Sequence, residues 1–250
     1  MTYGKFAYLY DTLMEDVPYN EWVNWVQRIS AKHGTTGVKL MDLACGTGQL
    51  SIQFSLAGFE VAGVDLSEDM LAVAQAKADA QGLKIPFFQQ DMTELDGHYE
   101  AYDIIGIFCD SLNYLREPLD IEKTFAGAHR HLADGGLFFF DVHSLHKMDH
   151  IFTDGPFTLN DEDISYIWNS FPGDQPHSAE HELTFFVLDE KTGMYDRVDE
   201  LHYQRTFEIS FYTNLLEKLG FELLEISADF LPSEPGPESE RILVAARKKE

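Results

Sequence analysis

Basic residues are scarce in this sequence. Of its 250 residues, 18 are Lys or Arg and 43 are Asp or Glu, so the formal net charge is −25. Because Lys and Arg supply most of a protein's affinity for a phosphate backbone, this balance makes a nucleic acid an unlikely partner. The one basic run, residues 247–249, is expected to be a solvated end after the last strand. The acidic excess favours solubility and attraction of cationic ligands.

Cysteines and long apolar runs are also rare. Cys45 and Cys109 match no metal-ligand spacing and form no disulfide framework, which favours a reduced, cytoplasmic compartment. No apolar stretch approaches the ~20 residues that a membrane-spanning helix needs. The N-terminus lacks the basic and apolar regions of a signal peptide. We therefore expect no membrane segment, and the oligomeric state is open.

Residues 38–50 combine a short apolar strand, a glycine turn and the start of a helix. Such a turn brings free backbone N–H groups and the positive end of a helix dipole to one point. Gly46 and Gly48 lack a Cβ, so the chain can turn sharply and a ligand can lie against it. The pattern predicts a nucleotide-cofactor cradle, although the dinucleotide fingerprint would require a glycine in place of Ser51.

An acidic residue ends the next strand. Residues 59–65 are mostly apolar, and Asp65 follows Gly46 by 19 positions. This spacing is close to the ~20 expected of an acid that binds a ribose diol. The alternative is that Asp65 caps the helix that begins near Ser67. The agreement of strand, acid and spacing favours the ribose role.

Strands and helices alternate along most of the chain. Trp22, Val26 and Ile29 follow Pro18 at helical spacing and predict a core-facing helix before the first strand. Further helices are predicted over residues 67–81, 119–133 and 208–219, and further strands over 85–90, 103–108, 137–142, 221–226 and 241–246. The proline-rich connection 232–237 cannot be a helix, so the last two strands must be antiparallel neighbours.

Residues 151–206 interrupt this alternation. Segments 164–168, 181–187 and 199–205 are β-rich and separated by turns. They predict an antiparallel cap inserted after the fifth strand and covering the site. The main domain then comprises residues 1–150 and 207–250.

Three motifs resemble those of a known family. Residues 42–48, 65–71 and 90–92 are similar to the cofactor motifs of class I S-adenosylmethionine-dependent methyltransferases, especially the small-molecule branch with sugar-amine and glycine-type N-methyltransferases. Ala44 departs from the glycine that many members carry. The resemblance implies a Rossmann-like seven-stranded sheet with a reversed last strand, and S-adenosylmethionine as cofactor. Ser51 and the reversed strand disfavour a dehydrogenase.

The resemblance also implies roles for individual residues. Asp91 would accept from the adenine amine, the alternative being an ordinary Asx turn. The cofactor-binding residues implied are Tyr3, Asp42, Ala44, Gly46, Gly48, Asp65, Leu66, Met70, Asp91, Met92 and Cys109.

The acceptor is expected beside the loop after the fourth strand, because ligands of open α/β sheets bind at the carboxyl ends of the strands. Asp110 and Tyr114 lie in this loop, where they could orient an acceptor and take its proton. Tyr10, in a Tyr-Asp pair resembling that of small-molecule N-methyltransferases, is the third candidate catalytic residue. Packing is the alternative for both tyrosines. The candidate substrate-binding residues are Asn113, His143, His202 and Arg205.

The alternative for Arg205 is a surface ion pair. His143, His146 and His150 are spaced like metal ligands, but nothing completes a ligand set, so no metal is expected. The sequence thus predicts methyl transfer from S-adenosylmethionine to an N or O atom of a small molecule. The alternatives are a regulatory module that binds the cofactor without turnover, and an RNA or protein methyltransferase.

Overall fold

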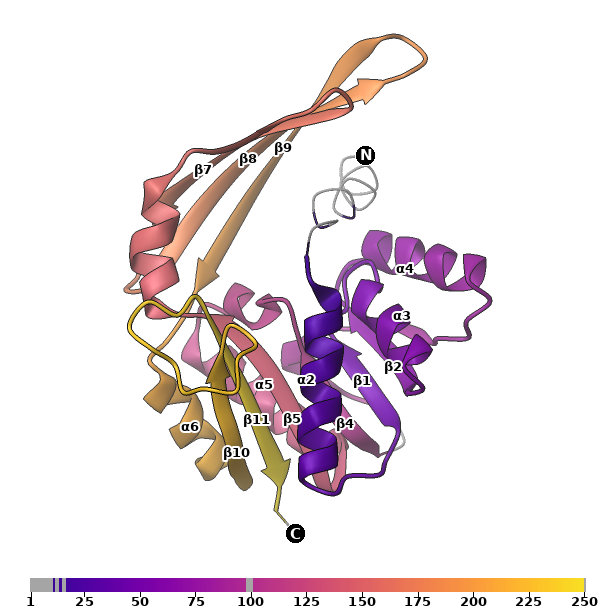
Figure 1. The fold of residues 1–250 in the computed structure, drawn as a ribbon, viewed down its shortest axis with the longest axis vertical. Helices are drawn as coiled ribbons and strands as arrows, with labels where there is room; N and C mark the ends of the chain where they lie inside the picture. Colours follow the sequence, from indigo (N-terminus) through magenta and orange to yellow (C-terminus); the bar gives the residue numbers. More distant parts are fainter. Residues whose placement is uncertain (1–10, 12–13, 15–16, 98–100, 250) are drawn as a thin grey trace.

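The computed structural model describes residues 11, 14, 17–97 and 101–249, and its main body is built on one mixed sheet (Figure 1). The order of the strands is β10-β11-β5-β4-β1-β2-β3, with β11 antiparallel to both of its neighbours. The bounds are β1 Lys39–Leu43, β2 Glu60–Asp65, β3 Phe87–Gln89, β4 Tyr102–Ile107, β5 Leu132–His143, β10 Phe221–Ala228 and β11 Arg241–Lys248. The Rossmann-like sheet with a reversed last strand is confirmed.

Helices cover both faces of this sheet because its central strands are apolar on both sides. On β5, Phe138 and Phe140 pack toward α5 (Pro118–His131) and α6 (Ile209–Lys218). Phe139 packs toward the opposite face, which is covered by α2 (Tyr19–Lys32) and α3 (Gln49–Leu56). The helix α4 (Glu68–Ala80) begins at Ser67, whose Oγ accepts from the N–H of Met70 at 3.3 Å.

A second, four-stranded antiparallel sheet, here called the cap sheet, is inserted between β5 and α6. Figure 1 shows it rising from the main body on the side away from the C-terminus. Its strands are β6 Phe157–Asn160, β7 Ile164–Pro172, β8 Ser178–Asp189 and β9 Met194–Arg205. Phe185 and Val198 form a small core in this sheet, and Met70 of α4 packs against it. The antiparallel insertion is confirmed, whereas the domain boundaries at residues 150 and 207 stay predictions.

Three local predictions were wrong. The helix predicted over 119–133 ends at His131, because β5 starts at Leu132 and carries Gly135 inside it. The third strand is only Phe87–Gln89, and β6 was not predicted at all.

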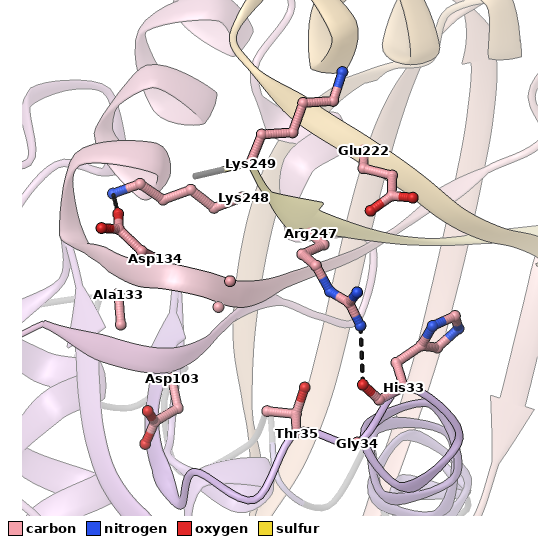
Figure 2. A pocket seen from close by; sticks show the side chains of 12 residues that line it. His33, Gly34, Thr35, Asp103, Ala133, Asp134, Glu222, Arg247, Lys248 and Lys249 are labelled. Carbon is pink, nitrogen blue, oxygen red and sulfur yellow. Dashed lines mark hydrogen bonds and ion pairs between the residues drawn. The ribbon is translucent and has the colours of Figure 1, made fainter.

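The basic run at residues 247–249 is not a solvated end. Arg247 and Lys248 belong to β11, and Figure 2 shows the surface pocket that they line. The guanidinium of Arg247 donates to the carbonyl of His33 at 3.0 Å, and the Lys248 ammonium lies 3.5 Å from the Asp134 carboxylate. The run therefore fastens the end of β11 to α2 and β5. No helix in the described part of the chain is long and apolar enough to cross a membrane.

The turn after β1 generates a testable expectation at Gly48. Its φ is +73°, and a Cβ there would lie 2.8 Å from the Cβ of Ala74. Gly82 has a similar φ of +69° but open space around it. Replacing either by Ala should cost about 1–2 kcal/mol for the left-handed backbone. Gly48→Ala should lose a further ~1–3 kcal/mol by overpacking. Urea denaturation measures both free energies of unfolding, and equal losses would contradict the close packing described.

Candidate active site

A cavity of about 670 Å³ lies between the carboxyl ends of the central strands and strand β9 of the cap sheet. It is lined by residues that follow four strands of the main sheet and by one stretch of the cap. These are Ala44–Thr47 after β1, Asp65–Ser67 after β2, Gln90–Thr93 after β3, Phe108, Cys109 and Ser111 after β4, and Glu200–Tyr203 of β9. The cavity thus joins the glycine turn to the cap sheet.

The glycine turn is organised by Asp65. Its carboxylate accepts from the N–H of Gly46 at 2.7 Å and from the N–H of Ser67 at 2.9 Å. Burial raises the pKa of Asp65, and these backbone bonds partly oppose that rise. Ser67, and not Asp65, supplies the side-chain cap of α4. Asp65 therefore borders the cavity where its ribose role was predicted, and that role stays a prediction.

The two glycines of the turn have different surroundings. A Cβ on Gly46 would point into open space, so this residue leaves the cavity wall free for a ligand. Gly48 lies directly before α3 and packs against Ala74 of α4. It does not line the cavity. The structure thus places Gly46 at the predicted cradle and gives Gly48 a packing role.

Asp42 and Ser51 form a buried pair beneath this turn. The Ser51 hydroxyl donates to the Asp42 carboxylate at 2.6 Å. Burial raises the pKa of Asp42 to about 7, although the hydrogen bond from Ser51 favours the ionised form. Ser51 occupies the position where the dinucleotide fingerprint has a glycine, and here its hydroxyl holds an acid of the cavity wall.

Asp91 forms an Asx turn, which was the alternative to its predicted contact with adenine. Its Oδ1 accepts from the N–H and the hydroxyl of Thr93, both at 2.8 Å. Asp91 and Met92 also line the cavity, as do Ala44, Leu66, Met70 and Cys109. The turn and the predicted adenine contact are compatible, because the contact would use the remaining carboxylate oxygen.

Thr47 connects the glycine turn to the N-terminal segment. Its hydroxyl donates to Asp11 at 2.5 Å, and the Lys77 ammonium of α4 binds the other oxygen of Asp11 at 2.8 Å. Sequence reasoning missed these bonds, which join residues more than thirty positions apart. Tyr3 and Tyr10, predicted to bind cofactor and acceptor, lie outside the described residues.

The loop after β4 is held by a buried charge cluster. Cys109 and Asp110 both have left-handed backbones, with φ of +53° and +52°. Asp110 donates its N–H to Asp141 at 2.9 Å, and its carboxylate binds Arg241 at 3.0 Å and His143 Nε2 at 3.2 Å. Arg241 also binds Asp141, which lies on β5 and is fully buried.

These contacts determine the ionisation of Asp110. Burial alone would raise its pKa, but neighbouring His143 and Arg241 and the hydrogen bonds from His143 and Gln204 hold it well below the usual range. Burial lowers the pKa of His143 itself, and the neighbouring Asp110 carboxylate partly opposes that shift. Asp110 does not line the cavity, and its catalytic role stays a prediction.

Three of the four predicted substrate-binding residues connect the cap sheet to the main body. Asn113 is fully buried, donates to the carbonyl of Arg205 at 2.8 Å and accepts from the N–H of His143 at 2.9 Å. The Arg205 guanidinium donates to the carbonyl of Arg116 at 2.8 Å and to the side chain of Gln175 at 2.5 Å. The structure places none of the three on the cavity wall.

Tyr114 and His202 are the predicted acceptor residues that the structure brings together in the cavity. The Tyr114 hydroxyl lies 3.3 Å from Nδ1 of His202. The sequence missed other lining residues, among them Glu200, Arg116 and Tyr203. Glu200 could have been found, because residues two apart on a strand share a face and His202 was already a candidate. The Arg116 guanidinium lies 5.0 Å over the Tyr203 ring.

The structure offers no metal centre among the residues it describes. No group of three His, Cys, Asp or Glu side chains there is placed to hold a metal ion. His146 and His150 lie with ring centroids 5.5 Å apart, whereas His143 is bound to Asp110.

The reversed strand β11 and the position of the cavity at the carboxyl ends of β1, β2 and β4 are together typical of a Rossmann-like methyltransferase. Residues 40–136 match the family model described as "Methyltransferase domain". A protein of Geobacillus sp. (strain WCH70) that is named "Putative methyltransferase" is 52% identical over 249 residues, covering 99% of this chain and 100% of that protein.

Solved structures agree with this assignment. An S-adenosylmethionine-dependent methyltransferase from Clostridium acetobutylicum ATCC 824 is 29% identical, with a TM-score of 0.88 and 99% of each chain covered. CalS10, an amino pentose methyltransferase from Micromonospora echinaspora solved with S-adenosylmethionine bound, is 18% identical with a TM-score of 0.73, covering 97% of this chain and 96% of that one. The chain belongs to the class I S-adenosylmethionine-dependent methyltransferases. It is an enzyme, and S-adenosylmethionine is its cofactor.

The charge cluster predicts how Arg241→Met should behave. The substitution leaves two buried carboxylates, Asp110 and Asp141, without their cation, which should destabilise the fold by roughly 3–5 kcal/mol at pH 7. In the variant, burial raises the pKa of Asp110 above its unfolded value, so protonation relieves the defect as the pH falls. In the wild-type protein the depressed pKa makes Asp110 stabilising above its unfolded pKa. This stability is lost only as the pH falls below that unfolded pKa, so it stays nearly constant between pH 7 and pH 4.5.

Urea denaturation between pH 7 and pH 4.5 measures this difference. The gap between wild type and Arg241→Met should narrow toward pH 4.5. Arg197→Met is the matched control, because Arg197 pairs with Asp199 on the exposed cap surface at 2.8 Å. It should leave the free energy of unfolding nearly unchanged at either pH, because solvent screens this exposed pair. If the difference in free energy of unfolding stays constant with pH, the destabilisation does not come from ionised carboxylates left without a cation.

Proposed function

We propose that this enzyme transfers the methyl group of S-adenosylmethionine to an N or O atom of a small molecule. The observation that carries the proposal is that one cavity reaches from the glycine turn to Tyr114 and to His202 of the cap sheet. Donor and acceptor can therefore share one chamber, which is what an in-line transfer requires, because catalysis of such a step is mostly positioning.

The cavity residues fit the cofactor. Gly46 leaves open space at the end of β1, and Asp65 borders that space with a carboxylate suited to a ribose diol. Asp91 and Met92 would hold the adenine, and Asp42 lies close to the turn. When bound, the cofactor would supply an electrophilic methyl group for the acceptor's lone pair. The protein then has to orient the acceptor and remove its proton.

A small acceptor is favoured over a macromolecule. The cap sheet supplies Glu200–Tyr203 to the cavity wall, so an acceptor has to fit beneath a strand. The net charge of −25 opposes binding of an RNA. The structural neighbour CalS10 acts on an amino pentose, which supports a small acceptor by analogy of fold. The free thiols of Cys45 and Cys109 support a cytoplasmic location.

The cofactor assignment is tested at Asp65. Asp65→Ala removes acceptors of charge-assisted hydrogen bonds that contribute roughly 1.5–3 kcal/mol each. The affinity for S-adenosylhomocysteine should fall by about 10- to 100-fold in isothermal titration. Asp69→Ala is the control, because Asp69 lies exposed in the first turn of α4 and does not line the cavity. If Asp65→Ala folds and binds S-adenosylhomocysteine as wild type does, the ribose assignment is wrong.

Turnover is tested by methyl transfer from labelled S-adenosylmethionine. A small-molecule extract of Geobacillus sp. (strain WCH70) is a suitable acceptor source, because its relative matches this chain over 249 residues. Label should enter compounds of low mass. Binding of the cofactor without transfer would indicate the regulatory alternative. Label in tRNA or protein, or salt-sensitive micromolar binding of tRNA in a gel shift, would indicate a macromolecular acceptor.

A further inference from the structure

The acceptor end of the cavity is acidic. Asp120 and Glu200 line it from α5 and β9, and Arg116 is the only Lys or Arg among the described residues that line the cavity. The Arg116 guanidinium is already engaged over the Tyr203 ring. Farther in, Asp42, Asp65 and Asp91 add three more carboxyl groups. A wall of this charge attracts a cation and repels an anion.

Glu200 has a further feature that suits a cationic ligand. Burial raises its pKa above the ordinary value, and burial is the whole cause of the shift. A positive group beside it would favour the ionised carboxylate and lower this pKa again. Glu200 shares its face of β9 with His202, because the two residues are two positions apart on one strand.

Tyr114 and His202 reach the cavity from different parts of the fold. Tyr114 belongs to the short 3₁₀ helix η2 (Ser111–Tyr114) after β4, and His202 belongs to the cap sheet. Their hydroxyl and Nδ1 atoms are 3.3 Å apart, and 48% of the Tyr114 surface stays exposed within the cavity. The cavity environment and the Asp110 carboxylate behind Tyr114 raise the pKa of its phenol, so the hydroxyl keeps its proton and can donate to Nδ1.

We propose that the acceptor is an amine that enters as an ammonium ion, and that Tyr114 and His202 together remove its proton. This inference rests on the proposed function and deepens it. The ammonium N–H gives its proton to the Tyr114 oxygen while Tyr114 passes its own proton to Nδ1 of His202. The pair then holds an intact phenol and an imidazolium, and the amine has the free lone pair that methylation requires. No oxidant or reductant is needed.

The surroundings of His202 permit this proton transfer. Burial lowers its pKa, so the imidazole is neutral at pH 7. His181 faces it across the β8–β9 pair, and burial and neighbouring His143 lower the pKa of His181 to about 4, so that ring is neutral too. Glu200 on its own strand, Asp120 of α5 and Asp110 near Tyr114 are acids of this region, and their negative charge would stabilise an imidazolium. Arg116 is the opposing cation.

The first test separates products by charge. Labelled methyl groups are transferred into the Geobacillus extract. The unreacted donor, which is itself a sulfonium cation, is first removed by chromatography, and the products then pass over a cation exchanger at neutral pH. A methylated amine is retained, whereas an ether or ester of an uncharged or anionic acceptor flows through. Label confined to the flow-through would overturn the amine inference while leaving the proposed function intact. Absence of label from all low-mass compounds would overturn the proposed function itself.

The second test uses Tyr114→Phe, His202→Gln and the double variant, with label in the retained fraction as the rate. Each single variant should be about 10²- to 10⁴-fold slower at pH 7, because a general base contributes that much. The double variant should be no slower than the worse single one, since the two residues act as a unit. The rates of the variants should rise tenfold per pH unit toward the pKa of the amine, as its free form accumulates, while wild type stays flat above pH 7.

The matched controls are the same substitutions at a tyrosine and a histidine that lie outside the cavity. Tyr195→Phe removes a hydroxyl of β9 that donates to the carbonyl of Glu162 at 2.8 Å, outside the cavity. His150→Gln removes an exposed imidazole that does not line the cavity. Both should turn over at the wild-type rate. Variants of Tyr114 and His202 that are slowed equally at all pH values would show a structural role and overturn the relay.

A third readout does not depend on turnover. In ¹⁵N-histidine spectra of the free protein, the signals lost in His202→Gln identify this ring. Nδ1 should be the unprotonated nitrogen, with a pKa below the ordinary 6.5. Tyr114→Phe removes the donor to Nδ1 and should shift its resonance. A protonated Nδ1 at pH 7, or no response to Tyr114→Phe, would contradict the proposed direction of proton transfer.

Discussion

The structure depends on one buried ion cluster, in which Arg241 compensates Asp110 and Asp141 between the main sheet and the cap. Asp141 also accepts from the indole N–H of Trp22 at 2.7 Å, so the cluster reaches α2 as well. Removing charges from water is costly, and such a cluster is stable only when every partner is present. In this protein the cluster serves to hold the left-handed turn at Asp110 in place, and the neighbouring residue Cys109 borders the cavity.

The same cluster fixes the cap sheet relative to the donor site. Gln204, near the end of β9, donates to Asp110 at 3.0 Å, and the hydroxyl of Thr206 donates to the carbonyl of His143 at 2.6 Å. Glu200 and His202 precede these anchors on the same strand. Their positions over the cavity therefore follow from bonds made behind its wall. Hydrogen bonds that run from the cap sheet into a buried polar network can specify one arrangement in this way.

The fold was predictable where local pattern decides it. The β1 turn, the start of α4 near Ser67 and the antiparallel pairing of the last two strands each follow from nearby residues in the sequence, and all were confirmed. The candidate site was less predictable. Arg241 and Asp110 are 131 positions apart, and the sequence around each of them gives no sign that the two will form an ion pair. Asn113 and Arg205 are predicted to bind the substrate, and the structure places both off the cavity wall. Asn113 binds backbone groups there, and Arg205 binds the carbonyl of Arg116 and the side chain of Gln175.

Asp110 and His202 show how the surroundings of a titratable residue decide its role. Their residue types alone do not tell which of the two could accept a proton. Both are titratable groups close to Tyr114. The sequence predicts Asp110 as a catalytic residue and His202 as a substrate-binding one. The Arg241 cation keeps Asp110 ionised with its oxygens occupied by Arg241, His143 and Gln204, so it has little capacity to accept another proton near neutral pH. Burial lowers the pKa of His202 instead, and its Nδ1 lies 3.3 Å from the hydroxyl of the cavity residue Tyr114. Environments that push two pKa values apart assign the acid and base roles of a site. Here they leave Asp110 as the positioning residue and His202 as the group able to take a proton.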